Sequence, residues 1–445
     1  MSGAMALTVA LMGAPSFAAA AEQVGPLAPL AAGPTTTASF LALSDIHYTA
    51  QSRQACNSKS PDAFETDPVL WSAAQAEAQR VIAAERPAFV IYLGDLPSHC
   101  DSRPDTDKDF TAALDGLAAI AGAGTKVIYV PGNNDSRAGD YEPFTSNGTP
   151  LDLSTAWKGS PVLNAGPGDM IDATHVPMGY YSAYAVQATA SAPALRVIAL
   201  NTNMFTLKYD QNVATYQADA NAQLEWLGAQ LKQARSKREK VIIAMHVPPG
   251  VNGYGGGTMW NAGLSYTGQD PDLVPGWAQK TFLQLVAGYR AEIVGLLSSH
   301  THVNEIRRLR DCSRKLPRLG AFTELDVAIP SITTDHGNNP SIKLFSYDGG
   351  FEWTENRTYY ASDATGAAWD TNTPLSFDRV NYPCASCSAG DTLAARIARL
   401  DKAKLVNTST KLAGMMIAWL DVGAPPPTSP GNYRLSLDVT CEVSE

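Results

Sequence analysis

Five short polar segments of this chain each follow directly on a run of apolar residues. They read DIHY at residues 45–48, GDLPSH at 94–99, PGNND at 131–135, MHVPP at 245–249 and SSHTH at 298–302. An apolar run of strand length that ends in polar residues is typical of a buried strand whose last residues leave the sheet. The pattern therefore predicts several strands that end side by side and bring Asp, Asn and His side chains to one edge.

The other apolar runs support a layered fold in which strands and helices alternate. Runs of strand length occur at residues 38–43, 88–93, 126–130, 195–200, 240–245, 292–297 and 342–347. Segments with helical composition or spacing lie between some of them, at 68–85, 109–120 and 223–234. This alternation indicates a layered α/β fold.

The composition fits a large folded unit. Of the 445 residues, 45% are hydrophobic and 17% charged, which suffices for a sizeable core and argues against disorder. The formal net charge of −10 leaves no global basic field, so we expect no nucleic-acid binding. No run reaches the roughly 18 apolar residues of a membrane-spanning helix. No protein partner is predicted from the sequence.

The two ends of the chain differ from its middle. Residues 1–21 resemble a secretory signal peptide, although no Lys or Arg precedes Arg53, and residues 22–36 have the composition of a linker. We therefore expect a secreted or periplasmic protein. The catalytic domain is expected at 37–352 and a C-terminal, partly helical subdomain at 353–445, with helical segments at 391–400 and 412–420.

The cysteines form an even set in a chain that we expect to be exported, which favours disulfides. They lie at positions 56, 100, 312, 384, 387 and 441. A pair between Cys56 and Cys100 and a local ring between Cys384 and Cys387 are two of the possible pairings. The alternative for Cys384-x-x-Cys387 is a redox or zinc motif.

The polar segments contain the side chains that divalent metals prefer. Carboxylate, imidazole and amide groups bind first-row divalent ions, and residues two apart on an extended segment project to the same side. Five of the seven histidines of the chain fall within these segments. The candidate metal ligands are Asp45, His47, Asp95, Asn133, His246, His300 and His302.

In this order the segments resemble the pattern of the calcineurin-like metallophosphoesterases: Asp-x-His, Gly-Asp, Gly-Asn-His-Asp/Glu, His and Gly-His-x-His. A closer likeness is to the acid-sphingomyelinase-like phosphodiesterases, carried by GDLPSH at 94–99, LNTN at 200–203, QLEWL at 223–227, HVPPG at 246–250 and residues 330–348. The resemblance implies a β-sandwich flanked by helices, with a small helical C-terminal appendage.

The resemblance also implies a ligand set and a reaction. One metal ion would take Asp45, His47, Asp95 and His302, and the other would take Asp95, Asn133, His246 and His300. Water activated between the two ions would attack phosphorus. The resemblance favours zinc in an exported protein, whereas the mixed N and O ligands suit manganese or iron as well.

The chain departs from the family pattern at two places. Asn134 stands where the family has a histidine beside the leaving group, and His99 resembles the histidine of the sphingomyelinase-like group. A Gly-Asn-Asn-Asp motif with a histidine four residues after Gly-Asp is also similar to endopolyphosphatases. We expect His99 to contact the phosphate or protonate the leaving oxygen and Asn134 to donate a hydrogen bond, the alternative for His99 being a supporting or surface position. The second departure is Ser299, which stands where the family pattern has the glycine before His300.

Three further residues are candidates for substrate contact. His336 lies in a segment that resembles one near the substrate pocket of the sphingomyelinase-like group. Tyr254 and Trp260, on the glycine-rich loop 250–263, could stack on a base or cover a choline group, and packing is the alternative for both.

The favoured function is an exported phosphodiesterase that acts on a small-molecule phosphoester. The alternatives are a phosphomonoesterase or polyphosphatase, and a metal-binding or phosphate-binding protein without turnover.

Overall fold

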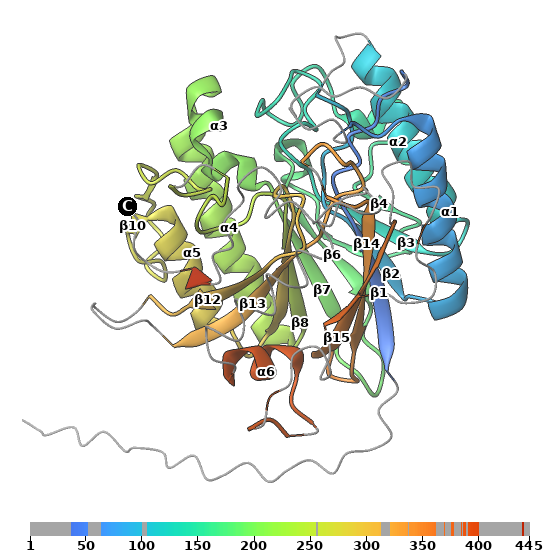
Figure 1. Cartoon of the computed structure of the whole chain (residues 1–445). Helices are drawn as coiled ribbons and strands as arrows, with labels where there is room; N and C mark the ends of the chain where they lie inside the picture. The colour runs from blue at the N-terminus through green and yellow to red at the C-terminus, as the bar shows by residue number, and fades with distance from the viewer. Residues whose placement is uncertain are drawn as a thin grey trace, which may run out of the picture. The chain divides into compact units, whose positions relative to one another are not determined.

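The computed structural model describes residues 37–51, 64–99, 105–254, 257–312, 321–336 and 338–361, and short pieces at 369, 375–377, 384, 386–388, 390–399 and 438–439. All of these residues belong to one compact unit. Within them, two sheets lie face to face and helices cover the outer face of each sheet (Figure 1).

The first sheet has the strand order β16-β15-β14-β1-β2-β3-β4. Its strands are β1 (Ala38–Leu43), β2 (Phe89–Tyr92), β3 (Lys126–Tyr129), β4 (Val162–Leu163), β14 (Ser341–Tyr347), β15 (Trp353–Tyr360) and β16 (Leu375–Phe377). Because β1, β2 and β3 run parallel, their carboxyl ends lie at the same edge of the sheet.

The second sheet has the order β17-β12-β13-β11-β8-β7-β6-β5. Its strands are β5 (Met170–Asp172), β6 (Tyr181–Val186), β7 (Leu195–Leu200), β8 (Lys240–Met245), β11 (Ile293–Ser298), β12 (Ile306–Arg310), β13 (Phe322–Ala328) and β17 (Asp438–Val439). The strands β7, β8, β11 and β13 are parallel. A separate hairpin joins β9 (Ser265–Tyr266) and β10 (Gly276–Trp277).

The α-helices are α1 (Pro68–Glu85), α2 (Asp105–Ala121), α3 (Leu207–Asn212), α4 (Tyr216–Lys237), α5 (Ala278–Gly288) and α6 (Leu393–Arg399), and the 3-10 helices are η1 (Pro150–Leu153), η2 (Val176–Met178) and η3 (Thr202–Phe205). Helices α1 and α2 cover the outer face of the first sheet, helices α4 and α5 cover that of the second, and α6 packs against the core between the sheets. Helix α1 starts where the sequence predicts, because Asp67 caps the amide of Leu70 and Pro68 occupies the first turn.

Alternating side chains of each strand enter different cores. In β1, Phe40 and Ala42 face the core between the sheets, whereas Leu41 faces the core under α1 and α2. In β8, Ile242 faces the core between the sheets and Ile243 faces α4 and α5. Since both faces are buried, the strands are continuous apolar runs, as the sequence shows.

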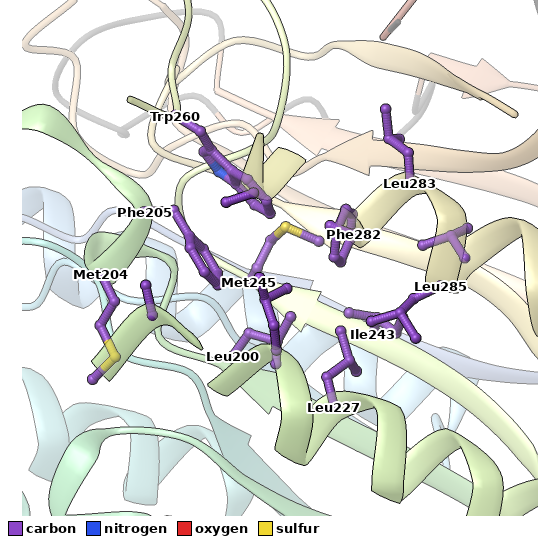
Figure 2. Packing of buried hydrophobic residues seen from close by; sticks show 14 of the residues in the cluster. Leu200, Met204, Phe205, Leu227, Ile243, Met245, Trp260, Phe282, Leu283 and Leu285 are labelled. Atoms are coloured by element: carbon purple, nitrogen blue, oxygen red, sulfur yellow. The ribbon is translucent and has the colours of Figure 1, made fainter. Parts of the chain in front are cut away.

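The core outside the second sheet is built from large apolar side chains of strand and helix. Figure 2 shows Leu200, Ile243 and Met245 of the sheet against Leu227 of α4 and Phe282 of α5. This packing fixes the strands whose carboxyl ends carry the polar segments.

These observations confirm the predicted layered β-sandwich flanked by helices. Helices α2 and α4 begin earlier than the apolar spacing indicated, at Asp105 and Tyr216. The short helix α6 confirms helical structure near residues 391–400, and it packs against β13 and β15. The predicted segment 412–420 lies outside the described residues.

The assignment of residues 353–445 to a subdomain of their own stays a prediction. Within that range β15 pairs along its length with β14, and β17 pairs with β12. Cys384 and Cys387 form the local disulfide that was one of the possible pairings. Cys56 and Cys100 lie outside the described residues.

Candidate metal centre

The seven predicted ligands gather where the carboxyl ends of parallel strands from both sheets meet. Asp45 and His47 follow β1, Asp95 follows β2, Asn133 follows β3, and the remaining three histidines follow β8 and β11. Ligand atoms of Asp45, His47 and His302 all lie within 4.8 Å of one another, and those of Asp95, His246 and His300 do so as well.

The two groups adjoin each other around Asp95. Its Oδ2 atom lies 3.5 Å from Nε2 of His47, a member of the first group. The same oxygen lies 3.2 Å from Nε2 of His246, a member of the second group. The Oδ1 atom of Asn133 is 3.1 Å from the same nitrogen of His246. Asp95 is therefore placed to contact ions in both groups.

Several of these atoms are buried without a hydrogen-bond partner. Among them are Oδ1 of Asp45, Nε2 of His47 and Nδ1 of His302. Buried polar atoms almost always have a partner, because leaving one unsatisfied costs about 1–3 kcal/mol. The donor set and its unpaired atoms thus fit bound divalent cations.

Hydrogen bonds behind two imidazoles direct them toward the centre. Nδ1 of His246 donates to the carbonyl of Leu93 at 2.6 Å, and Nδ1 of His47 lies 3.2 Å from the carbonyl of Pro97. A proton on Nδ1 leaves Nε2 free to bind a metal. Ser299, which replaces the family glycine, lies with its hydroxyl 2.8 Å from Nδ1 of His246.

Most of the ligands have a backbone conformation that non-glycine residues rarely adopt. Positive φ costs energy for residues with a Cβ atom, and such residues cluster at functional sites. The ligands with positive φ are Asp45 (48°), His47 (47°), Asp95 (63°), His300 (66°) and His302 (60°).

The loops after β2 and β3 lie against each other and leave no room for side chains. A Cβ atom on Gly132 would lie 2.1 Å from Oδ1 of Asp95, and one on Gly94 would lie 2.2 Å from the Gly132 nitrogen. Asp135 joins the loops, since its carboxylate accepts from the amides of Asp95, Leu96 and Gly132 at 2.7–2.9 Å. The sequence contained Asp135 in its motif but did not indicate this role.

A second acidic residue, Asp140, orients Asn133. The amide nitrogen of Asn133 donates to Oδ1 of Asp140 at 2.7 Å, so the amide oxygen faces His246. Asp140 also lies 3.6 Å from the ammonium group of Lys208. No sequence pattern pointed to Asp140, which lies in the irregular segment after β3.

Carboxylates determine the electrostatics of the centre. Burial lowers the pKa of His47, but the nearby carboxylates of Asp45 and Asp95 outweigh burial and raise that pKa to about 10. For His246, burial is likewise outweighed by Asp95, and the pKa rises to about 9. Both shifts indicate a negative potential where the imidazoles converge, and the same potential favours bound cations.

His99 and Asn134 lie together beside the ligands. Nδ2 of Asn134 is 3.3 Å from Nε2 of His99 and donates to Oδ2 of Asp95 at 2.9 Å. The His99 ring stacks on that of His47, with centroids 4.3 Å apart. Nδ1 of His99 lies 2.7 Å from a carboxylate oxygen of Glu65, which the sequence analysis missed.

A cavity of about 600 Å³ opens over this arrangement. Its lining includes Asn133, Asn134, His99 and His300, together with Tyr141, Lys208, Asn252, Tyr254 and His336. The ring of His336 lies edge-on to His302 at 4.4 Å and 4.9 Å from the ring of Tyr254. His336 and Tyr254 are therefore placed to contact a bound molecule.

Trp260 is not placed to contact a substrate. It has no exposed surface, stacks on Phe205 at 4.4 Å, and donates its indole N–H to the carbonyl of Val247. Figure 2 shows it among the apolar side chains next to Phe205. The packing alternative holds for Trp260, because its loop turns this side chain into the core.

The model of the calcineurin-like phosphoesterase family matches residues 38–304. The chain is similar to the cyclic GMP-AMP phosphodiesterase SMPDL3A of Rattus norvegicus, with 26% identity over 273 residues that cover 60% of this chain and 55% of that protein. It is 28% identical over 218 residues to sphingomyelin phosphodiesterase 2 of Caenorhabditis elegans, covering 47% of this chain and 31% of that protein.

A solved dimetal phosphatase from Danio rerio aligns over 77% of this chain and 98% of its own, with 14% identity and a TM-score of 0.44. The chain spans about half the length of the SMPDL3A relative from Rattus norvegicus. The family and relatives confirm the resemblance drawn from the five polar segments. At the level of the family they also confirm the expectation of a metal-dependent phosphoester hydrolase.

Proposed function

Because the chain belongs to the calcineurin-like phosphoesterase family, we propose that it is a phosphodiesterase that uses two divalent cations. One cation would be held by Asp45, His47, Asp95 and His302, and the other by Asp95, Asn133, His246 and His300. The observation that carries this proposal is the convergence of buried, unpaired ligand atoms beside a cavity that Asn133 and His300 of the same centre help to line. Bound cations would polarise the phosphoryl oxygens and activate water for attack.

The residues of the chain then act on the leaving group. As water bonds to phosphorus, the bond to the leaving oxygen breaks with its electron pair on that oxygen, which takes a proton from Nε2 of the doubly protonated His99 ring. Of the two protons that water loses, one restores the proton of His99 and the other passes to solvent. Asn134 donates a hydrogen bond and cannot replace His99 as an acid, since its amide does not titrate. Proton transfer of this kind contributes about 10² to 10⁴ in rate.

A diester is favoured over a monoester by the space in the site. The cavity of about 600 Å³ extends past the ligands to Tyr254, Lys208 and His336, leaving room for a second ester group. The relatives from Rattus norvegicus and Caenorhabditis elegans are both named as phosphodiesterases. We propose a small-molecule phosphodiester as substrate and zinc as the bound metal, with manganese or iron as alternatives.

Export also stays a proposal. It rests on residues 1–21, which lie outside the described residues. In the part of the chain that the structure describes, no helix has the length and apolar character needed to cross a bilayer.

The proposed function is tested on the full chain, whose metal content is measured after purification. We expect about two metal ions per chain and faster hydrolysis of bis-p-nitrophenyl phosphate than of p-nitrophenyl phosphate. Asp95→Asn should lose both metal and turnover, whereas Asp115→Asn, on the exposed side of α2, should retain them. Preference for the monoester or for polyphosphate would support those alternatives, and bound metal without any turnover would identify a binding protein.

A further inference from the structure

We propose that Glu65 is a positioning residue that fixes the tautomer and orientation of His99, so that Nε2 faces the leaving group. The inference rests on the proposed function. The segment that contains Glu65 precedes α1 and lies outside all five polar segments of the sequence. Its importance appears only in the folded chain.

Two hydrogen bonds bring Glu65 and His99 together. Oε1 of Glu65 is 2.7 Å from Nδ1 of His99 and also accepts from the His99 backbone amide at 3.2 Å. An ionised carboxylate can only accept hydrogen bonds, so Nδ1 carries the proton of the neutral ring. Nε2 is then the nitrogen left for the substrate side, and it holds the proton for the leaving oxygen once the ring has taken up a second proton.

The other side of the ring agrees with this assignment. Nε2 of His99 lies 3.3 Å from the amide nitrogen of Asn134, a group that can only donate. The second hydrogen of that amide is directed to Oδ2 of Asp95 at 2.9 Å. The His99 side chain keeps 19% of its surface exposed and lines the cavity, so a substrate can reach Nε2.

The backbone around Glu65 is fixed to the ligand loop. The amide of Thr66 donates to the carbonyl of His47 at 3.0 Å, and the amide of Thr49 donates to the carbonyl of Thr66 at 2.9 Å. Through this pairing, the backbone next to Glu65 is hydrogen-bonded to the loop after β1. The Glu65 carboxylate can therefore serve as a rigid support for His99.

The burial of Glu65 points to a functional role. Its side chain has no exposed surface, and Oε2 has no hydrogen-bond partner. A buried carboxylate is costly unless it is paired, and the side-chain hydrogen bond of Glu65 is with His99. Oε2 lies 4.0 Å from Nδ1 of His47, beyond hydrogen-bonding distance, and His99 remains the hydrogen-bonded imidazole.

A third cation bound by His47, Glu65 and His99 explains the contact between Glu65 and His99 less well than a shared proton does. Ligand atoms of His47, Glu65 and His99 lie within 4.8 Å of one another, as in a metal site. Bonds of about 2.0–2.2 Å in tetrahedral geometry separate ligand atoms by roughly 3.3–3.6 Å. The contact of 2.7 Å between Glu65 and His99 is shorter than this and fits a shared proton.

The experiment compares Glu65→Gln with the wild type on two diesters, bis-p-nitrophenyl phosphate and diphenyl phosphate. The second has the more basic leaving group and depends more on proton donation. We expect kcat on diphenyl phosphate to fall about tenfold or more, with a smaller loss on the nitrophenyl diester and unchanged metal content. Glu77→Gln, a buried carboxylate on α1 paired with Arg80, is the matched control and should change neither rate.

A double-mutant cycle separates positioning from general structural damage. In a His99→Ala background, Glu65→Gln should cause no further loss, because both changes remove the same function. Equal losses on both diesters, or a further loss without His99, would overturn the inference. So would unchanged kinetics of Glu65→Gln in an active enzyme, whereas an inactive wild type would overturn the proposed function and this inference with it.

A spectroscopic readout does not depend on activity. With ¹⁵N-labelled histidine, the neutral His99 ring of the wild type should show a protonated Nδ1, and Glu65→Gln should show a mixture of tautomers or the opposite one. A wild-type ring protonated at Nε2 alone would contradict the proposal even if the variant failed to fold.

Discussion

At the scale of single residues, the site combines strained ligands with supporting groups that the ligands require. Five of the seven candidate ligands have positive φ between 47° and 66°. Such conformations cost of order 1–3 kcal/mol each and persist only where the surroundings determine them. Asp135 provides part of that support, because its carboxylate accepts hydrogen bonds from backbone amides of the loops after β2 and β3.

Asp140 gives a residue-scale prediction. Asp140→Ala removes the acceptor for the Asn133 amide nitrogen, so the amide can rotate and present nitrogen in place of oxygen to the metal. We expect metal affinity at the site of Asn133 to fall about 10- to 100-fold, as for other groups that orient a ligand. Metal titration followed by calorimetry measures the change.

Asp152→Ala is the control for that variant. Asp152 lies in the same long segment after β3 but is exposed on η1, away from the ligands. Its replacement should leave both binding steps intact. Wild-type affinity in Asp140→Ala would show that Asn133 keeps its orientation without this carboxylate.

At the scale of elements, the glycine-rich loop after β8 places one aromatic side chain at the cavity and another in the core. Tyr254 lines the cavity and donates its hydroxyl to the carbonyl of Thr301 at 2.6 Å, next to two ligands. Trp260 enters the core between α5 and η3. The loop therefore joins the cavity to the core outside the second sheet.

This division predicts opposite effects of two substitutions in one loop. Trp260→Ala should lower the free energy of unfolding by about 3–5 kcal/mol, the usual cost of removing a buried aromatic side chain, with KM unchanged. Tyr254→Ala should raise KM several-fold with a much smaller loss of stability. Denaturant unfolding and steady-state kinetics on both variants test the pair, and a raised KM in Trp260→Ala would return that residue to the substrate site.

The strand β12 shows why some elements were not predicted. Its sequence, IRRLR, contains three arginines and no apolar run. In the fold Arg307 is fully buried, donating to the carbonyl of Pro249 and to Glu305. A charged strand of this kind depends on partners far away in the sequence, which local hydrophobicity does not reveal.

At the scale of the whole molecule, buried charges make stability depend on pH. Burial raises the pKa of Glu324 on β13 to about 8, although a hydrogen bond from the Leu325 amide acts in the opposite direction. The folded state thus binds this proton more tightly than the unfolded state. The stabilisation is complete below the ordinary pKa of about 4.3 and is lost as pH rises toward 8.

Glu324→Gln removes this dependence, because glutamine is neutral at every pH. Relative to the wild type, the variant should gain at least about 1 kcal/mol in free energy of unfolding between pH 5 and pH 8, the value of roughly one pKa unit. Urea unfolding at both pH values measures the gain. Glu355→Gln, on β15 and partly exposed, is the control, and a constant difference for Glu324→Gln across this range would contradict the prediction.

The sequence by itself determined the layered fold and brought the candidate ligands to one edge. Both follow from local information: apolar runs of strand length that end in Asp, Asn or His, and strands such as β1 and β8 that are buried on both faces. A ligand such as Asp45 is recognisable because it interrupts an apolar pattern.

Only the tertiary structure decided which residues support the ligands and which way loop side chains point. Glu65 and Asp140 belong to no periodic pattern, and their roles arise from contacts with His99 and Asn133 that the fold creates. Trp260 was a candidate substrate contact from the sequence, and the structure places it in the core. A supporting contact depends on the spatial approach of separate segments, and side-chain direction in an irregular loop depends on what it packs against, so neither leaves a local signal in the chain.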